Sequence, residues 1–176
     1  FLLTCTTGGT VKRTALSAYS NIRTSGIIGV AIEDGDHLLT ATIVTEGKDV
    51  LLGTASGMTI RFDIADVRPT GRDSRGVKGI ELREGDRVVG MSIIEDADSQ
   101  QVLSVSVNGF GKRTPVGEWR RQSRGGVGII GIETSERNGE MVKISLVRSD
   151  DQVMVITDGG QIIRTRVGEI REAGRN

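Results

Sequence analysis

The chain is built from a unit that is plainest in the stretch Val102-Leu103-Ser104-Val105-Ser106-Val107-Asn108-Gly109-Phe110-Gly111-Lys112-Arg113. Apolar residues alternate over residues 102–107, which predicts a strand with one face on a core and the other toward water. Gly109 follows this strand, and Arg113 comes four residues later. The order of apolar strand, glycine, three residues and arginine occurs four times in the chain.

The four copies keep a nearly constant spacing. Their glycines are Gly9, Gly57, Gly109 and Gly160, and their arginines are Arg13, Arg61, Arg113 and Arg164. The glycines are 48, 52 and 51 residues apart, a period typical of solenoids and propellers. We therefore predict one partial domain over residues 1–176, with repeats at about 1–49, 50–100, 101–151 and 152–176, the last incomplete.

Two further landmarks fall inside the repeat. The first is a Gly-x-x-Gly step, found at 26–29, 76–79 and 125–128, and the second is a glycine followed by an acid, found at 35–36, 85–86 and 139–140. The second landmark is typical of a tight hairpin. In the second repeat we expect strands at 50–55, 59–62, 79–82 and 88–94. The fold class is therefore all-β, a propeller-like disc of four-stranded blades.

The composition limits the chemistry that the chain can perform. Cys5 and His37 are the only residues of their kinds, so an intrachain disulfide is excluded and a zinc site has too few soft ligands. No apolar run approaches the roughly 20 residues that span a bilayer, and we expect a cytoplasmic protein. Because Phe1 begins inside an apparent strand, we also expect the chain to be a piece of a longer protein.

Charge is segregated within the repeat, although 23 basic residues balance 23 acidic ones overall. The segment 109–125 has a local balance of +4, whereas the segment 81–98 has a balance of −4. Because the repeat recurs, the basic loops are expected to line up along one rim. This charge pattern predicts contacts with the phosphates of duplex DNA that do not depend on the base sequence. The predicted contacts are Lys12, Arg13, Arg23, Arg61, Arg72, Arg75, Lys78, Lys112, Arg113, Arg120, Arg121, Arg124, Arg164, Arg166 and Arg175.

The residues at 109–114 and 118–128 resemble a blade of the C-terminal domain of the DNA gyrase A protein, and so do those at 74–80 and 156–176. The resemblance covers the whole chain. It implies a β-pinwheel that wraps duplex DNA and supports ATP-dependent negative supercoiling. It further implies a bacterial, chromosome-associated A2B2 tetramer, in which missing parts of the chain meet the gyrase B protein and a second copy of gyrase A. The fragment itself carries no catalytic residue and no cofactor, since ATP and Mg²⁺ are used elsewhere in the tetramer.

The family's signature box, Gln-Arg-Arg-Gly-Gly-Lys-Gly, is approximated by Gln122-Ser123-Arg124-Gly125-Gly126-Val127-Gly128, here called the box-like loop. Two basic positions have become Ser123 and Val127. We interpret it as a degenerate loop of a later blade, with the true box upstream; a weakened box is the alternative. Its glycines would let backbone amides approach phosphate while Arg124 supplies charge. A purely structural role in a tight crossing between blades remains open.

Other functions fit the sequence less well. Residues 126–131 match the dinucleotide fingerprint G-x-G-x-x-G, but they follow an arginine-rich loop instead of a strand. Tyr19 has no neighbours resembling the motif of a topoisomerase nucleophile, so no catalytic residue is assigned. The alternatives are the C-terminal domain of the topoisomerase IV A protein and a protein-interaction propeller that binds an acidic partner. Competition by long duplex DNA would separate the latter from a DNA-binding domain.

Overall fold

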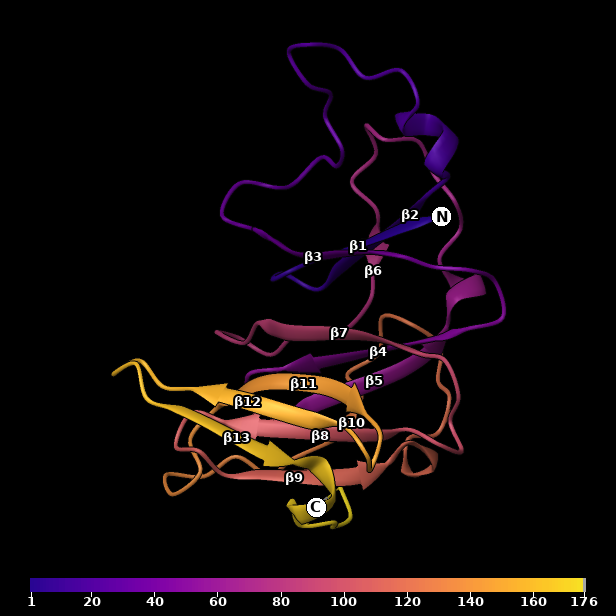
Figure 1. Ribbon diagram of the computed structural model, residues 1–176. Coiled ribbons are helices and arrows are strands. Elements are labelled where there is room, and N and C mark those ends of the chain that lie inside the picture. The colour runs from indigo at the N-terminus through magenta and orange to yellow at the C-terminus, as the bar shows by residue number, and fades with distance from the viewer. Residues whose placement is uncertain (176) are drawn as a thin grey trace.

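The computed structural model describes residues 1–175, and its regular elements are strands and short 3-10 turns. Asn176, at the end of the predicted fourth repeat, lies outside the described residues. The strands form four antiparallel sheets; in Figure 1 the first lies at the top, the second below it, and the third and fourth overlap in the lower part of the view. The predicted all-β fold class is confirmed.

Each sheet is described by its strands in spatial order. The first contains β3 (Leu38–Ile43), β1 (Leu2–Thr6), β2 (Thr10–Thr14) and β6 (Val77–Lys78). The second contains β10 (Ile129–Ile130), β5 (Met58–Asp63), β4 (Asp49–Thr54) and β7 (Val88–Ile94). The third contains β11 (Met141–Val147), β8 (Gln101–Ser106) and β9 (Gly111–Pro115), and the fourth contains β12 (Gln152–Ile156) and β13 (Ile162–Arg166). A 3-10 turn follows the second strand of each repeat: η1 (Leu16–Tyr19), η2 (Ile64–Asp66), η3 (Val116–Glu118) and η4 (Val167–Glu169).

The first and second sheets each receive one strand from the repeat that follows. The second repeat supplies β6, which pairs with β2 of the first repeat, and the third repeat supplies β10, which pairs with β5 of the second. The prediction of a strand at 79–82 is therefore wrong. Pairing stops at Lys78, because the Gly79 amide donates to the Gly9 carbonyl at 2.8 Å and Ile80 turns into the core. The strands predicted at 50–55, 59–62 and 88–94 are confirmed as β4, β5 and β7.

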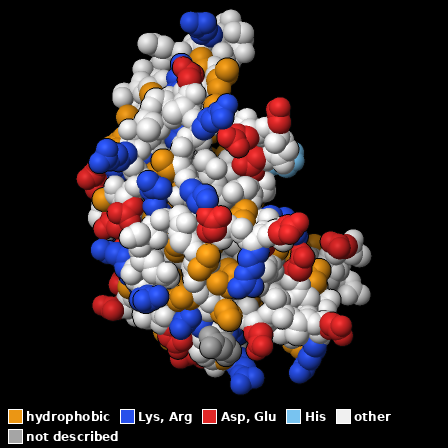
Figure 2. Space-filling model, turned by 180° about the vertical axis from the view of Figure 1, so that it is seen from behind, with side chains coloured by type: hydrophobic (Ala, Val, Ile, Leu, Met, Phe, Trp, Pro, Cys, Tyr) orange, Lys and Arg blue, Asp and Glu red, His pale blue; other side chains and the backbone are white. Residues whose placement is uncertain are grey.

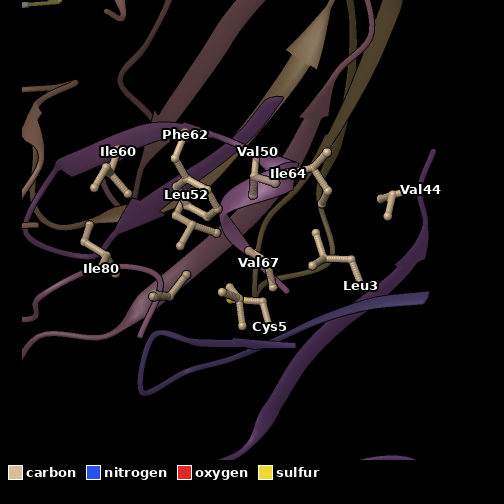
Figure 3. Close-up of a cluster of buried hydrophobic side chains, with 12 residues drawn as sticks. Leu3, Cys5, Val44, Val50, Leu52, Ile60, Phe62, Ile64, Val67 and Ile80 are labelled. Carbon is tan, nitrogen blue, oxygen red and sulfur yellow. The ribbon is translucent and has the colours of Figure 1, made fainter. Parts of the chain in front are cut away.

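The hydrophobic cores lie between consecutive sheets. In Figure 3, Val50 and Leu52 of β4 gather with Leu3 and Cys5 of β1. The intervening residue Leu51 belongs instead to a second cluster, together with residues of the third repeat. Successive side chains of a strand point to opposite faces, so β4 is buried on both faces. The second blade is thus held in place by apolar contacts on either side.

Strand β8 of the third repeat shows the same arrangement. The prediction that one face of residues 102–107 meets water is wrong for the paired part of the strand, where Val102 packs in the second cluster and Leu103 in a third. Serines fill the alternate positions, and Ser104 and Ser106 are buried. The sequence pattern resembles a half-exposed strand because the small hydroxyl side chains are polar, yet they fit between stacked sheets.

Two of the acids that follow a hairpin glycine, Asp36 and Asp86, each tie two turns together. Asp86 Oδ1 accepts the amides of Ser56 and Arg87 at 3.0 and 2.8 Å, and Asp36 Oδ1 accepts the amides of Gly8 and His37, both at 2.7 Å. Burial alone would raise the pKa of Asp86, but the hydrogen bonds from Ser56, Thr54 and Arg87 lower it overall. These carboxylates act in the turns, as their positions beside hairpin glycines indicate.

The lowered pKa of Asp86 predicts that the stability of the fold decreases in acid. Because the folded-state pKa is lowered, the stabilisation is fully present above the ordinary pKa of an aspartate and is lost as the pH falls through the folded-state value. We expect Asp86→Asn to be less stable at neutral pH and to lose less stability than the wild type on acidification. Urea unfolding at neutral and acidic pH measures both effects. Equal pH dependence of the two proteins would contradict this assignment.

Candidate nucleic-acid interface

After η2, η3 and η4 the chain crosses to the preceding blade. Isolated parallel bridges join Arg13 to Pro69, Arg61 to Arg121 and Arg113 to Glu172. The amides that follow donate to the carbonyls of the same arginines: Thr70 to Arg13 at 2.9 Å, Gln122 to Arg61 at 2.8 Å and Ala173 to Arg113 at 3.0 Å. These bonds align the loops residue for residue. We call residues 68–76, 120–128 and 171–175 the crossing loops.

A buried or half-buried residue anchors the start of each crossing loop. The anchors are Val67, Trp119 and Ile170. Trp119 is 1% exposed, and its Nε1 donates to Thr59 Oγ1 at 2.8 Å. Because an indole N–H needs a partner when buried, this bond orients Trp119 on the preceding blade. The anchors fix the position of whatever side chain comes next.

Three of the four recurring arginines, Arg13, Arg61 and Arg113, have side chains that are engaged within the fold. Arg61 donates from Nε to Asp49 Oδ2 at 2.7 Å and from NH1 to the Trp119 carbonyl at 3.0 Å. Arg113 makes the equivalent bond to the Ile170 carbonyl at 2.8 Å. Arg13 is 5% exposed, and its guanidinium lies 4.8 Å from the centroid of the Phe1 ring. We therefore assign the side chains of Arg61 and Arg113 to joints between blades, whereas that of Arg13 is buried within the first repeat beside Phe1 and Glu46.

Two of the predicted lysines are also engaged within the fold. Lys12 is 1% exposed, and its Nζ donates to the carbonyls of Gly29, Gly71 and Arg72. Lys112 donates in the same way to the carbonyls of Gly174 and Arg175. Burial is the main cause that lowers the pKa of both lysines. A desolvated ammonium is costly unless it is hydrogen-bonded, so each lysine holds a crossing loop against the preceding blade.

Replacing Lys12 with methionine tests this role. The change leaves carbonyls of the crossing loop without their donor, and we expect the free energy of unfolding to fall by about 1–3 kcal/mol. Urea denaturation measures the loss. Lys78→Met is the matched control, because Lys78 is exposed and pairs only with Glu81 at the surface. Equal stabilities of the two variants would show that the Lys12 contacts do not support the fold.

A third set of arginines links each crossing loop to the preceding repeat. Arg72, Arg124 and Arg175 occupy equivalent positions and donate to the carbonyls of Ile28, Lys78 and Ile130, at 2.6, 3.1 and 3.0 Å. Neutral carbonyls accept these bonds, so the bonds do not neutralise the guanidinium charges. Arg72 and Arg124 therefore contribute positive potential to the rim, whereas Arg175 Nε also lies 3.9 Å from Glu118 Oε2.

In the box-like loop, two of the glycines serve the crossing itself. Gly128 has φ +74°, and a Cβ there would lie 2.3 Å from the Thr59 carbonyl oxygen. The amide of Gly125 donates to the Gly79 carbonyl at 2.7 Å. Gly126 has open space, since the nearest atom to its Cβ position, Ile60 Cδ1, lies 3.9 Å away. The structural interpretation of the loop therefore accounts for Gly125 and Gly128, whereas Gly126 and Val127 face solvent.

One arginine at the start of each crossing loop is free. Arg68, Arg120 and Arg171 directly follow the anchors, and all three are exposed. Within residues 1–175, none of their side chains makes a hydrogen bond or an ion pair. An open hollow beside Arg68 is also lined by Ser123 and Arg124. This recurring position presents one unpaired cation for each blade junction.

The structure therefore divides the predicted contact residues by their engagement. Arg23, Arg120 and Arg166 are exposed without an ion pair among the described residues, and Arg164 is exposed with a bond to Gln152. Arg75, Lys78 and Arg121 are exposed but pair with acids. Sequence reasoning missed Arg68 and Arg171, which an alignment of the repeats on Val67, Trp119 and Ile170 would have found.

Charge is distributed unevenly over the surface. Figure 2 shows lysine and arginine side chains gathered toward one long edge, with acids among them, and a cluster of acids beside the histidine on the opposite edge. Across residues 1–175 there is no group of three or more acidic, histidine or cysteine side chains placed to hold a metal ion. Over the same residues, no helix is long and apolar enough to cross a membrane.

The stacked antiparallel blades, their exchanged strands and the arginine-bearing crossing loops define a repeat-built β-propeller-like domain. A family model described as "DNA gyrase C-terminal domain, beta-propeller" matches residues 1–45, 48–95, 100–148 and 151–176, and the chain belongs to this family. The predicted resemblance to the DNA gyrase A protein and the predicted β-pinwheel are confirmed.

The similar proteins agree with this assignment. The DNA gyrase A protein of Staphylococcus epidermidis is 43% identical over 175 residues, which are 99% of this chain and 20% of that protein. A solved gyrase A C-terminal domain superposes with a TM-score of 0.88 at 28% identity, covering 99% of this chain and 58% of that one. The C-terminal domain of a DNA topoisomerase IV superposes with a TM-score of 0.93 at 25% identity, covering 99% and 54%. The chain thus spans about a fifth of the length of its curated relative.

Proposed function

We propose that this chain binds duplex DNA without sequence preference and wraps it along the crossing loops. The observation that carries the proposal is the set of Arg68, Arg120 and Arg171, exposed at one equivalent position of three successive junctions. Their guanidinium groups can neutralise phosphates in succession, which positions a duplex without reading its bases. Arg72, Arg124 and Arg175, which donate to backbone carbonyls, lie in the same loops and add to the attraction for phosphate.

Wrapping requires that the contacts offset the cost of bending. A smooth bend of a short duplex costs on the order of 1–6 kcal/mol, and several phosphate contacts can supply this. The curved path is set by blades that are fixed to one another through buried joints, so the protein does not have to reorganise. A rigid frame with exposed arginines is suited to a strongly curved polyanion.

The membership of the family supports a wider role. We infer that the chain acts within a gyrase tetramer, with the gyrase B protein and a second copy of gyrase A, during ATP-dependent negative supercoiling on the chromosome in the cytoplasm. In this proposal ATP and Mg²⁺ act in other parts of the tetramer. A role in topoisomerase IV is the second candidate, because the topoisomerase IV domain has the same fold. Curated relatives that are 40–43% identical to this chain are gyrase A proteins, which favours gyrase.

Binding to linear duplexes of increasing length tests the proposal. We expect affinity to rise with length until the duplex reaches from the first crossing loop to the last, and to fall steeply with salt. An excess of unrelated long duplex should compete fully. Affinity independent of length would contradict wrapping, and absence of binding would favour an acidic protein partner.

A further inference from the structure

Arg121 of the box-like junction lies between two carboxylates. Its NH2 group is 2.8 Å from Asp49 Oδ1, and its NH1 group donates to Asp63 Oδ2 at 3.2 Å. The Arg121 side chain is 56% exposed and that of Asp63 is 31% exposed, whereas Asp49 is 3% exposed. One partner of this arginine is thus buried, and the other lies at the surface.

The cluster exists at only one junction among the described residues. Proline and glutamate, Pro69 and Glu172, stand at the positions equivalent to Arg121 in the other crossing loops. The position of Asp63 at the end of β5 is occupied by Pro115 at the end of β9 and by Arg166 at the end of β13. The contacts that hold every junction together therefore do not require the ion pair between Arg121 and Asp63.

Both carboxylates keep a partner when Arg121 turns away. Asp49 Oδ2 accepts from Arg61 Nε at 2.7 Å, so the buried charge stays paired. Asp63 Oδ1 accepts the amide of Ala65 at 2.8 Å and caps η2, while its other oxygen reaches solvent when released. The cost of displacing Asp63 from Arg121 is therefore small, because Asp63 is partly exposed and an exposed ion pair contributes little to stability.

We propose that Asp63 holds Arg121 in the place of a DNA phosphate, and that the duplex displaces this carboxylate when it binds. Arg121 follows the free Arg120 directly, so it stands on the path inferred for the duplex. The inference rests on the proposed function and assigns a competitor to one of its contacts. Asp63 thereby weakens DNA binding at the junction of the second and third repeats.

Neutralising Asp63 tests the inference. Asp63→Asn keeps an oxygen that can cap η2, and Asp66→Asn is the matched control, because Asp66 is an exposed acid of the same turn. We expect D63N to bind a long duplex about two- to fivefold more tightly than D66N at low salt, the range set by a surface ion pair. In the background of Arg121→Ala, the two neutralised acids are expected to have equal effects.

The measurement uses the full chain and records binding isotherms across a salt series, with urea unfolding of every variant. Asp63→Ser, which also supplies a capping oxygen, replaces D63N if the latter fails to fold. Equal affinities of D63N and D66N, or an advantage of D63N that persists with Arg121→Ala, would overturn the competition while leaving wild-type binding intact. Failure of the wild-type chain to bind duplex would overturn the proposed function and this inference together.

Discussion

Replacing Gly128 with alanine is expected to lower the free energy of unfolding by more than about 1–3 kcal/mol, the strain of a non-glycine residue in the left-handed region. Gly128 has φ +74°, and the added Cβ would lie 2.3 Å from the carbonyl oxygen of Thr59. The strand β10 begins at the next residue and pairs with β5, so the joint between the second and third repeats should open. Urea denaturation followed by circular dichroism measures the loss.

The matched control is Gly126→Ala in the same loop. Gly126 has an ordinary φ, and the nearest atom to the added Cβ would be 3.9 Å away. We expect its stability to stay within about 0.5 kcal/mol of the wild type, as for an unstrained surface site. A Gly128→Ala chain as stable as the Gly126→Ala chain would show that the glycine is not required by the crossing.

Replacing Arg68, Arg120 and Arg171 together with glutamine is expected to weaken binding to every duplex, whatever its sequence. Loss of one phosphate contact reduces the salt slope of the binding constant by about 1, so the triple variant should lose about 3. Because the three side chains are exposed and make no bond among residues 1–175, thermal stability should not change. Fluorescence anisotropy across a salt series measures the slope.

The control removes three positive charges that lie outside the crossing loops. Arg83, Arg137 and Lys143 are exposed in the hairpin turns and in β11, and their replacement by glutamine produces the same change of net charge. We expect this control to retain nearly the whole salt slope. Equal salt slopes for the two triple variants would show that binding depends on net charge and not on the position shared by Arg68, Arg120 and Arg171.

The sequence predicted the repeats because their spacing records which positions are equivalent, and equivalent positions recur in the structure. Gly57 and Gly109 lie in the turn between the two strands of a hairpin, and Arg61 and Arg113 fall on the next strand, β5 or β9. The spacing did not show on which side of the strand the arginine lies. The sequence alone does not distinguish an arginine that donates to the Trp119 carbonyl from an arginine that faces solvent.

The exchange of strands was not predictable from the repeat unit alone. Residues 79–82 read as the third strand of their own repeat, yet the strand that forms there, β6 at Val77–Lys78, pairs with the preceding blade, as β10 does in the next repeat. The choice depends on Gly79 and Gly131, which fit closely against the preceding hairpin. Such contacts join residues of neighbouring repeats that are far apart in the sequence, as Val11 and Val77 are, and a local pattern does not report them. Arg68 and Arg171 were missed for the same reason, because their register is set by the buried anchors Val67 and Ile170.

Ligation of relaxed circular DNA in the presence of the chain tests the central claim most directly. If the crossing loops wrap the duplex, the linking number of the closed circles should shift in proportion to bound protein, and the Arg68, Arg120 and Arg171 triple variant should abolish the shift. The triple control at Arg83, Arg137 and Lys143 should preserve it. Saturated binding with an unchanged linking number would contradict wrapping and leave a straight DNA-binding surface in its place.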